Sequence, residues 1–296
     1  MKKFGPVGDS ALAKLTLTPF DITKKLMEEL AAGDVRLPSF PDVAARVQRV
    51  LEDERATPMQ IGKVLGADAA LAARVLRIAN SAVFNVSGKP VSDLPTAVRR
   101  LGHELVRCAA MSFALKQMKV DGGDRKLRPK LAELWRTGAL VASIGFVLAR
   151  ETGASTPDEA LVTGLLHNIG RLYLLVRAQA MSTAIADTGI WDEILQDWHP
   201  RFGRAILEHW KFPAPIVAAV GEQNSRVARI TGSYKLTGVL ICAIALVPCV
   251  FYRKLLDDTV TSVAPFEELG LKTEDCKRML AATVRQINSL RDALAG

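Results

Sequence analysis

The stretch "TPDEALVTGLLHNIG", residues 156–170, carries a complete helix-start signal followed by an apolar run. Thr156 offers the side-chain oxygen of an N-cap, and Pro157 suits the first helical position. Glu159 stands three residues after the cap, which completes a capping box. The pattern predicts a helix that ends near His167.

Helical signals of the same kind continue along the chain. The segment "TPMQIGKVLG", residues 57–66, repeats the capping box. No stretch combines sustained apolar and polar alternation with hairpin turns, so we predict an all-α fold. Periodicity and stop signals predict further helices over residues 22–32, 41–52, 69–79, 97–101, 103–118, 131–151, 201–210, 216–222 and 274–294.

The segment "VDGGDRKLRP", residues 120–129, is the clearest internal boundary, because a glycine pair, several charges and a proline separate two apolar helices. We therefore divide the chain into a loosely held tail over residues 1–20, a helical N-terminal part over residues 21–120, and a helical C-terminal part over residues 121–296.

Composition predicts a globular protein with a sizeable core, since 49% of the 296 residues are hydrophobic. No secretory pattern opens the sequence, so we expect a cytoplasmic location. Four scattered cysteines without a Cys-x-x-Cys pair predict buried thiols. The uncharged run 236–252 is interrupted by Pro248, and we expect a buried core helix there instead of a membrane span.

The net charge of +8 lies in the first half of the chain. Lys and Arg outnumber Asp and Glu by 24 to 15 in residues 1–150, against 15 to 16 in residues 151–296. Residues 58–65 and 69–80 have the spacing of a helix-turn-helix, with Arg74 and Arg77 on the second helix. These arginines alternate with apolar residues, so a solvated basic surface is favoured over a nucleic-acid site.

Five segments in this order resemble the HDOD family, the HD-related output domains of bacterial signalling proteins. They are "RLPSFPDVAARV" (36–47), "GADAALAARVLRIANSAVF" (66–84), "AVRRLG" (97–102), "LLHNIGRL" (165–172) and "HPRFGRAILEHWKFP" (199–213). The resemblance covers about residues 34–225. It implies a helical N-terminal subdomain packed on a helical HD-like subdomain, related to the HD and HD-GYP phosphohydrolases.

The resemblance also indicates how far the metal site of those enzymes is retained. Active relatives carry a ligand histidine where this chain has Thr137, and a His-Asp pair where it has His167 and Asn168. A second histidine pair would fall at Gln223 and Asn224. Two retained histidines are too few for a metal centre, so we expect neither a metal nor a cofactor.

Other residues of the predicted vestigial site are His199, the second retained histidine, and Arg171, which stands where active relatives often have Lys. Arg171 would bind an anion or form a surface ion pair. His167 is expected to be a hydrogen-bonded core histidine, and Asn168 to bond neighbouring backbone.

These features predict a non-catalytic regulatory module that acts through protein–protein interaction with a signalling partner. Its interface is predicted in a groove between the subdomains, formed by Asn80, Ser81, Arg74 and Arg77 beside the vestigial site. The alternatives are a residual metal-dependent hydrolase of a nucleotide or cyclic dinucleotide, a nucleotide sensor without turnover, and a nucleic-acid-binding regulator, which is the least favoured.

Overall fold

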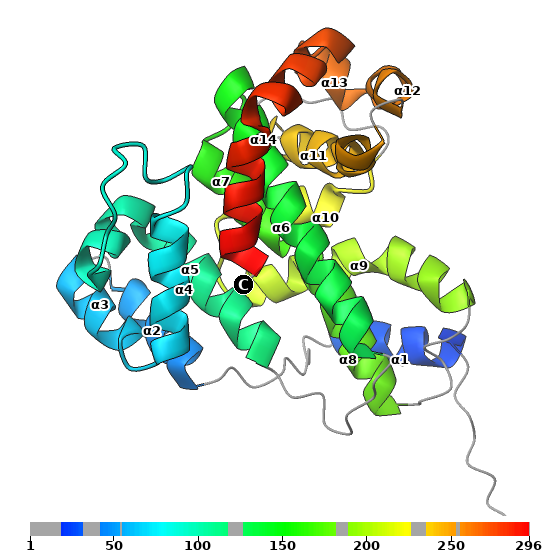
Figure 1. Cartoon of the computed structure of the whole chain (residues 1–296). Helices are drawn as coiled ribbons and strands as arrows, with labels where there is room; N and C mark the ends of the chain where they lie inside the picture. Colours follow the sequence, from blue (N-terminus) through cyan, green and yellow to red (C-terminus); the bar gives the residue numbers. More distant parts are fainter. Residues whose placement is uncertain are drawn as a thin grey trace, which may run out of the picture.

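The computed structural model describes residues 19–31, 42–53, 55–117, 127–181, 189–225, 235–252 and 255–295, which form helices and turns without a strand (Figure 1). The predicted all-α fold is confirmed. The helices in chain order are α1 (Pro19–Ala31), α2 (Asp42–Leu51), α3 (Pro58–Leu65), α4 (Ala69–Ala79), α5 (Leu94–Gln117), α6 (Leu127–Thr152), α7 (Pro157–Leu166), α8 (Ile169–Met181), α9 (Gly189–His209), α10 (Ala214–Glu222), α11 (Lys235–Phe251), α12 (Leu256–Ser262), α13 (Pro265–Glu268) and α14 (Thr273–Ala295).

Several local predictions are confirmed. Both capping boxes form, at Thr57 of α3 and at Thr156 of α7. Helix α4 has the predicted bounds, and Gly102 interrupts α5 with a φ of 75°, which separates the two helices predicted there. Helix α9 begins well before the predicted start at residue 201, because it continues through Pro200. Helices α8, α12 and α13 were not predicted.

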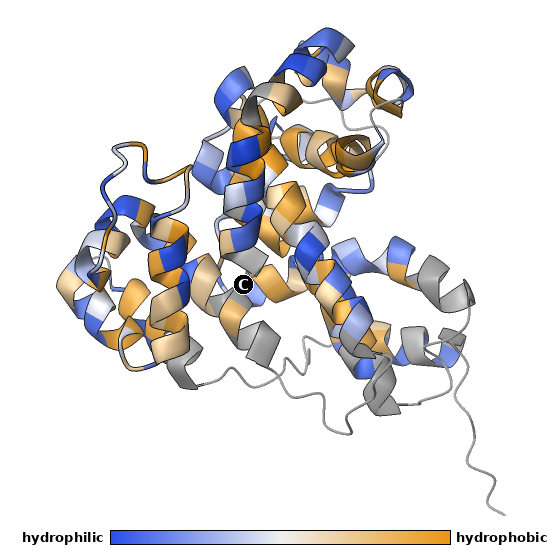
Figure 2. Ribbon diagram, in the orientation of Figure 1, coloured by the Kyte–Doolittle hydropathy of each residue, from blue (hydrophilic) through white to orange (hydrophobic). Residues whose placement is uncertain are grey.

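Two groups of helices make up the molecule. In the first, α5 packs against α2, α3 and α4. In the second, the long helix α6 packs against α7, α11 and α14, and apolar residues line the sides on which these helices meet (Figure 2). Contacts of α5 with α7 and of α14 with α4 join the two groups.

Helix α1 packs with the second group, although residues 21–31 were predicted to belong to the N-terminal part. It lies against α9, and the carboxylate of Glu29 accepts two hydrogen bonds from Arg177 of α8, at 2.9 and 2.6 Å. Most of the expected tail and most of the expected boundary, residues 1–18 and 118–126, lie outside the described residues. The predicted division at residue 120 therefore stays a prediction.

Glycines allow the helices around the candidate site to approach closely. A Cβ at Gly164 of α7 would lie 2.5 Å from the Cα of Ala142 in α6. A Cβ at Gly170 of α8 would collide with the backbone carbonyl of His199 in α9. These two crossings set the positions of α7, α8 and α9 relative to one another.

The apolar helices are core elements. Helix α11 contributes nine buried residues, as expected for the run 236–252, and all four cysteines are buried. Among the described residues, Pro129–Thr152 of α6 has the length and hydropathy to cross a membrane, but 61% of its most apolar window is buried in the bundle. That burial is typical of a core helix.

Candidate functional site

Two buried histidines form the centre of the candidate site. His167 follows the last residue of α7 and His199 lies in the middle of α9, and each is 3% exposed. The ring nitrogen Nδ1 of His167 lies 2.6 Å from the carbonyl oxygen of Gly164. The expectation of a hydrogen-bonded core histidine is therefore confirmed for His167.

Burial keeps both rings uncharged. It lowers the pKa of His167 to about 3 and that of His199 to about 4. The nearby guanidinium of Arg171 also disfavours protonation of both rings. Because a carbonyl oxygen cannot donate a hydrogen bond, each neutral ring carries its proton on Nδ1 and its lone pair on Nε2.

Pro200 explains why His199 and Asn224 turn toward backbone. Proline has no N–H to donate to the carbonyl of Gln196, four residues earlier in α9. That carbonyl accepts instead from Nδ1 of His199 at 2.9 Å and from the side-chain amide of Asn224 at 2.7 Å. The side chain of Asn224 thus ties the end of α10 to the middle of α9.

Gln223 links the end of α10 to the end of α7 and to His199 of α9. Its amide nitrogen donates to the carbonyl oxygens of His167, at 3.0 Å, and Val220, at 2.8 Å. Its side chain also lies beside the ring of His199. Gln223 and Asn224, which were expected at the positions of a histidine pair, thus both donate to backbone carbonyls.

The donor set does not match a divalent metal ion. Hard and borderline metals in such a site need carboxylates and several imidazoles. Among the described residues, no group of three or more His, Cys, Asp and Glu side chains is placed to hold a metal ion. The side-chain amides of Gln223 and Asn224 are turned toward backbone carbonyls.

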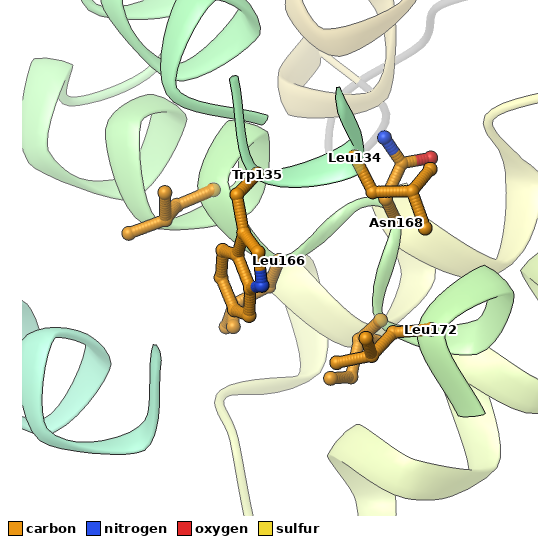
Figure 3. A pocket seen from close by; sticks show the side chains of 7 residues that line it. Leu134, Trp135, Leu166, Asn168 and Leu172 are labelled. Atoms are coloured by element: carbon orange, nitrogen blue, oxygen red, sulfur yellow. The ribbon is translucent and has the colours of Figure 1, made fainter. Parts of the chain in front are cut away.

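Asn168 departs from its expected role. Its side chain is 8% exposed, and within the described part of the chain it makes no hydrogen bond to backbone or side chain. It lines a small pocket, here called the Trp135 slot, between the first half of α6 and the corner where α7 meets α8 (Figure 3). The slot is lined by Leu134, Trp135, Leu165, Leu166, Asn168, Ile169 and Leu172.

Thr137, which was expected at the position of a ligand histidine, interacts within its own helix. Its hydroxyl lies 3.5 Å from a carboxylate oxygen of Glu133, one turn earlier in α6. Its side chain is partly buried.

The predicted interaction groove needs correction for most of its residues. Arg74 is 2% exposed, and burial lowers its pKa to about 10, so it is a core residue and not part of a surface. The side-chain nitrogen of Asn80 donates to the carbonyl oxygen of Val91, and its side-chain oxygen accepts from the N–H of Val91, each at 2.7 Å. Ser81 is buried. Arg77 is exposed.

The structure does not bring the Asn80–Ser81 segment to the histidine pair. The following residue, Ala82, donates its N–H to Ser289 of α14 at 3.0 Å, and Phe84 packs edge-on against Phe146 of α6. The α7 backbone near His167 lies instead against Gly138 of α6. Positions 138 and 146 are separated by about 12 Å along a helix axis. The two predicted parts of the groove thus lie along different parts of α6.

The sequence analysis did not identify Leu134 and Trp135 as residues that line a pocket. Leu134 and Trp135 are partly buried residues near the start of α6. A large tryptophan within the polar stretch "AELWRTG", residues 132–138, was the available signal. The residues that complete the slot come from α7 and α8, so the sequence pattern of α6 alone did not disclose a pocket.

Comparison with known proteins found a matching protein family, one curated relative and several similar solved structures. The HDOD domain matches residues 37–226. A curated relative, an uncharacterized protein of Treponema pallidum (strain Nichols), is 24% identical over 212 residues, which are 67% of this chain and 39% of that protein. The chain therefore spans about two fifths of the length of that relative.

Solved structures show the same fold. A protein of Shewanella amazonensis SB2B, provisionally named a metal-dependent phosphohydrolase, is 23% identical with a TM-score of 0.73, covering 93% of this chain and 99% of that one. A protein of Marinobacter aquaeolei VT8, provisionally named a signal transduction protein, is 21% identical with a TM-score of 0.56, covering 96% of this chain and 68% of that one. At these identities the likeness establishes the fold.

Proposed function

Because this chain belongs to the HDOD family, we propose that it is a non-catalytic signal-transduction module that works by binding another protein. The observation that carries the proposal is the orientation of the polar residues at the former metal site. His199 and Asn224 are turned toward backbone carbonyls of α9, and Gln223 is turned toward the carbonyls of His167 and of Val220 in α10. The polar groups of these residues bond the backbone of the protein itself, whereas in a phosphohydrolase the polar groups at this place bind a metal ion and a phosphate.

Charge at the site supports the same proposal. An active site for phosphate ester hydrolysis needs anionic ligands that hold metal ions and lower the pKa of a bound water. Here the carboxylate of the His-Asp pair is replaced by Asn168, and the guanidinium of Arg171 lies near both rings.

A residual metal-dependent phosphohydrolase is the second candidate, and one observation favours it. Both rings carry Nε2 lone pairs, and each Nδ1 is held by a backbone carbonyl, which is how metal-bound histidines are commonly oriented. The name of the Shewanella amazonensis SB2B protein fits this alternative.

The experiment measures metal content and turnover together. Purified protein is exposed to Mn²⁺, Fe²⁺ and Ni²⁺, desalted and examined by elemental analysis, and the same samples are assayed with bis-p-nitrophenyl phosphate and a cyclic dinucleotide. We expect less than stoichiometric metal and no turnover. Stoichiometric metal with turnover that His167→Ala abolishes would show that the chain is an enzyme.

The binding part of the proposal is tested by affinity capture from native lysate. The intact chain should retain a partner that is not retained by Gly164→Val, a bait whose packing against Ala142 is disrupted. Retention of the same proteins by both baits would contradict specific recognition.

A further inference from the structure

Helix α1 covers one side of α8 and α9, here called the α8–α9 face, which contacts α1 and carries Arg177 (Figure 1). Two side chains anchor the helix there. Leu26 is fully buried. Glu29, three residues later on the same side of α1, accepts two hydrogen bonds from Arg177. Lys24 and Lys25 are exposed, so α1 is an amphipathic helix seated by one apolar and one acidic residue.

Helix α1 is separated in space from the helix that follows it in the chain. Helix α2 packs against α5 in the first group, whereas α1 packs against α9 in the second. Residues 32–41 are the connection between them. With 13 residues, α1 is near the minimum length at which an isolated helix is stable in water, so its helical state depends on docking. Another amphipathic helix of the same pattern could therefore take its place.

The guanidinium of Arg177 is only partly used by α1. Both hydrogen bonds to Glu29 come from a single nitrogen, Nη2, at 2.9 and 2.6 Å. The neighbouring Nε is buried, and within the described part of the chain it has no hydrogen-bond partner. The two side chains are 19% and 17% exposed, so water compensates little for the missing bond. A guanidinium binds a carboxylate best through two parallel bonds from two nitrogens, and Glu29 does not provide that arrangement.

We propose that the α8–α9 face is the binding site for an amphipathic helix of a partner protein, and that α1 covers it until that helix displaces α1. The partner helix carries a large apolar residue in the place of Leu26 and, about one turn away, a carboxylate that accepts from both Nε and Nη2 of Arg177. The seated α1 shows the pattern that the face accepts, and the unpaired Nε leaves room for a tighter occupant. The inference rests on the proposed function, since it names the partner class of a binding module.

The first measurement is the affinity of a fluorescein-labelled α1 peptide, residues 19–31, for the full chain, by fluorescence polarisation. Leu26→Asp in the chain should loosen α1, because it places a carboxylate in an apolar contact. Val86→Asp is the matched control at an 88% exposed residue. We expect Leu26→Asp to bind the peptide at least about tenfold more tightly than the intact chain or the control. A tenfold difference corresponds to α1 docked in about nine molecules of ten.

A second opening variant, Glu29→Arg, keeps the test decisive if Leu26→Asp does not fold, which circular dichroism at 222 nm checks. It loosens α1 by placing two guanidinium groups together and leaves Leu26 intact. We expect it to raise the affinity for the peptide as Leu26→Asp does.

Charge reversal then tests the contact with Arg177. In the Leu26→Asp chain, Arg177→Glu should weaken binding of the α1 peptide by at least about tenfold, and a peptide with Glu29→Arg should recover most of that loss. Arg285→Glu, the matched control, reverses an exposed charge on α14 and should leave the affinity unchanged.

The pattern of the partner is tested with α1 peptides displayed on phage and randomised at positions 25, 26, 28 and 29. The bait is the intact chain, from which a successful peptide must displace α1. We expect a large apolar residue at position 26 and Asp or Glu at one or more of the other positions. The enriched peptides should bind at least about threefold more tightly than the α1 peptide, because they pair the free Nε, and Arg177→Glu should remove that gain.

The proposal is overturned if the α1 peptide binds the opened and the intact chain equally, if Arg177→Glu leaves its affinity unchanged, or if no enriched peptide binds more tightly than α1 itself. A dimer of the intact chain in light scattering, dissociated by Leu26→Asp, would make α1 of a second copy the occupant and would also overturn it. Each of these outcomes without metal-dependent turnover leaves the proposed function standing. Turnover that requires His167 rejects the proposed function itself.

Discussion

Acidification should destabilise this protein through its two buried histidines before most carboxylates titrate. In the native state, burial lowers the pKa of His167 to about 3 and that of His199 to about 4. In the unfolded chain both return to the ordinary value of 6.5. Between these values the unfolded state binds more protons than the native state, so the free energy of unfolding falls as the pH falls below 6.5.

The size of the effect follows from the width of that interval. Each histidine lowers the free energy of unfolding by about 1.4 kcal/mol per pH unit below 6.5. At pH 5.5 the pair should therefore cost about 3 kcal/mol relative to pH 7.5. That is a large share of the roughly 5–15 kcal/mol by which domains are stable.

The assay is urea unfolding, followed by circular dichroism at 222 nm, at pH 7.5, 6.5 and 5.5. His167→Asn with His199→Asn removes both titrating rings and keeps an amide donor near the place of Nδ1. The exposed His209, changed to Asn, is the matched control. Equal stability of the wild type at pH 7.5 and 5.5, or an undiminished pH dependence in the double variant, would refute the reasoning.

Three further substitutions test close packing and buried hydrogen bonds of the fold. Gly170→Ala should lower stability by about 1–3 kcal/mol or more, because its Cβ would collide with the carbonyl of His199, and the melting temperature reports this. Asn80→Ala should cost about 1–3 kcal/mol by freeing both backbone groups of Val91, with faster amide exchange there as the readout. Gln223→Leu should lower the urea midpoint by leaving two carbonyls without its amide, and an unchanged midpoint would show that these bonds contribute nothing.

Much of the fold was predictable because its signals are local. The capping boxes at Thr57 and Thr156 depend on residues three positions apart, and Gly102 breaks α5 through its own backbone freedom. The amphipathic period placed α4 within its observed bounds. Such signals are complete within one or two helical turns, so the sequence contains them in full.

The continuation of α9 through Pro200 could not be predicted from local sequence signals. A proline inside a helix leaves the carbonyl four residues earlier without its partner, which predicts a helix start instead of a continuing helix. The helix continues because Asn224 and His199 supply donors to that carbonyl. Asn224 is 28 residues away from Gln196, and no local pattern brings it there.

By itself the sequence determined the all-α class and the principal helices. The tertiary structure decided that Arg74 is buried and that Asn80 is engaged with Val91. It also decided that Asn168 lines an apolar slot built with Trp135. The physical reason is that backbone conformation responds to neighbours along the chain, whereas the environment of a side chain is set by helices that meet only after folding.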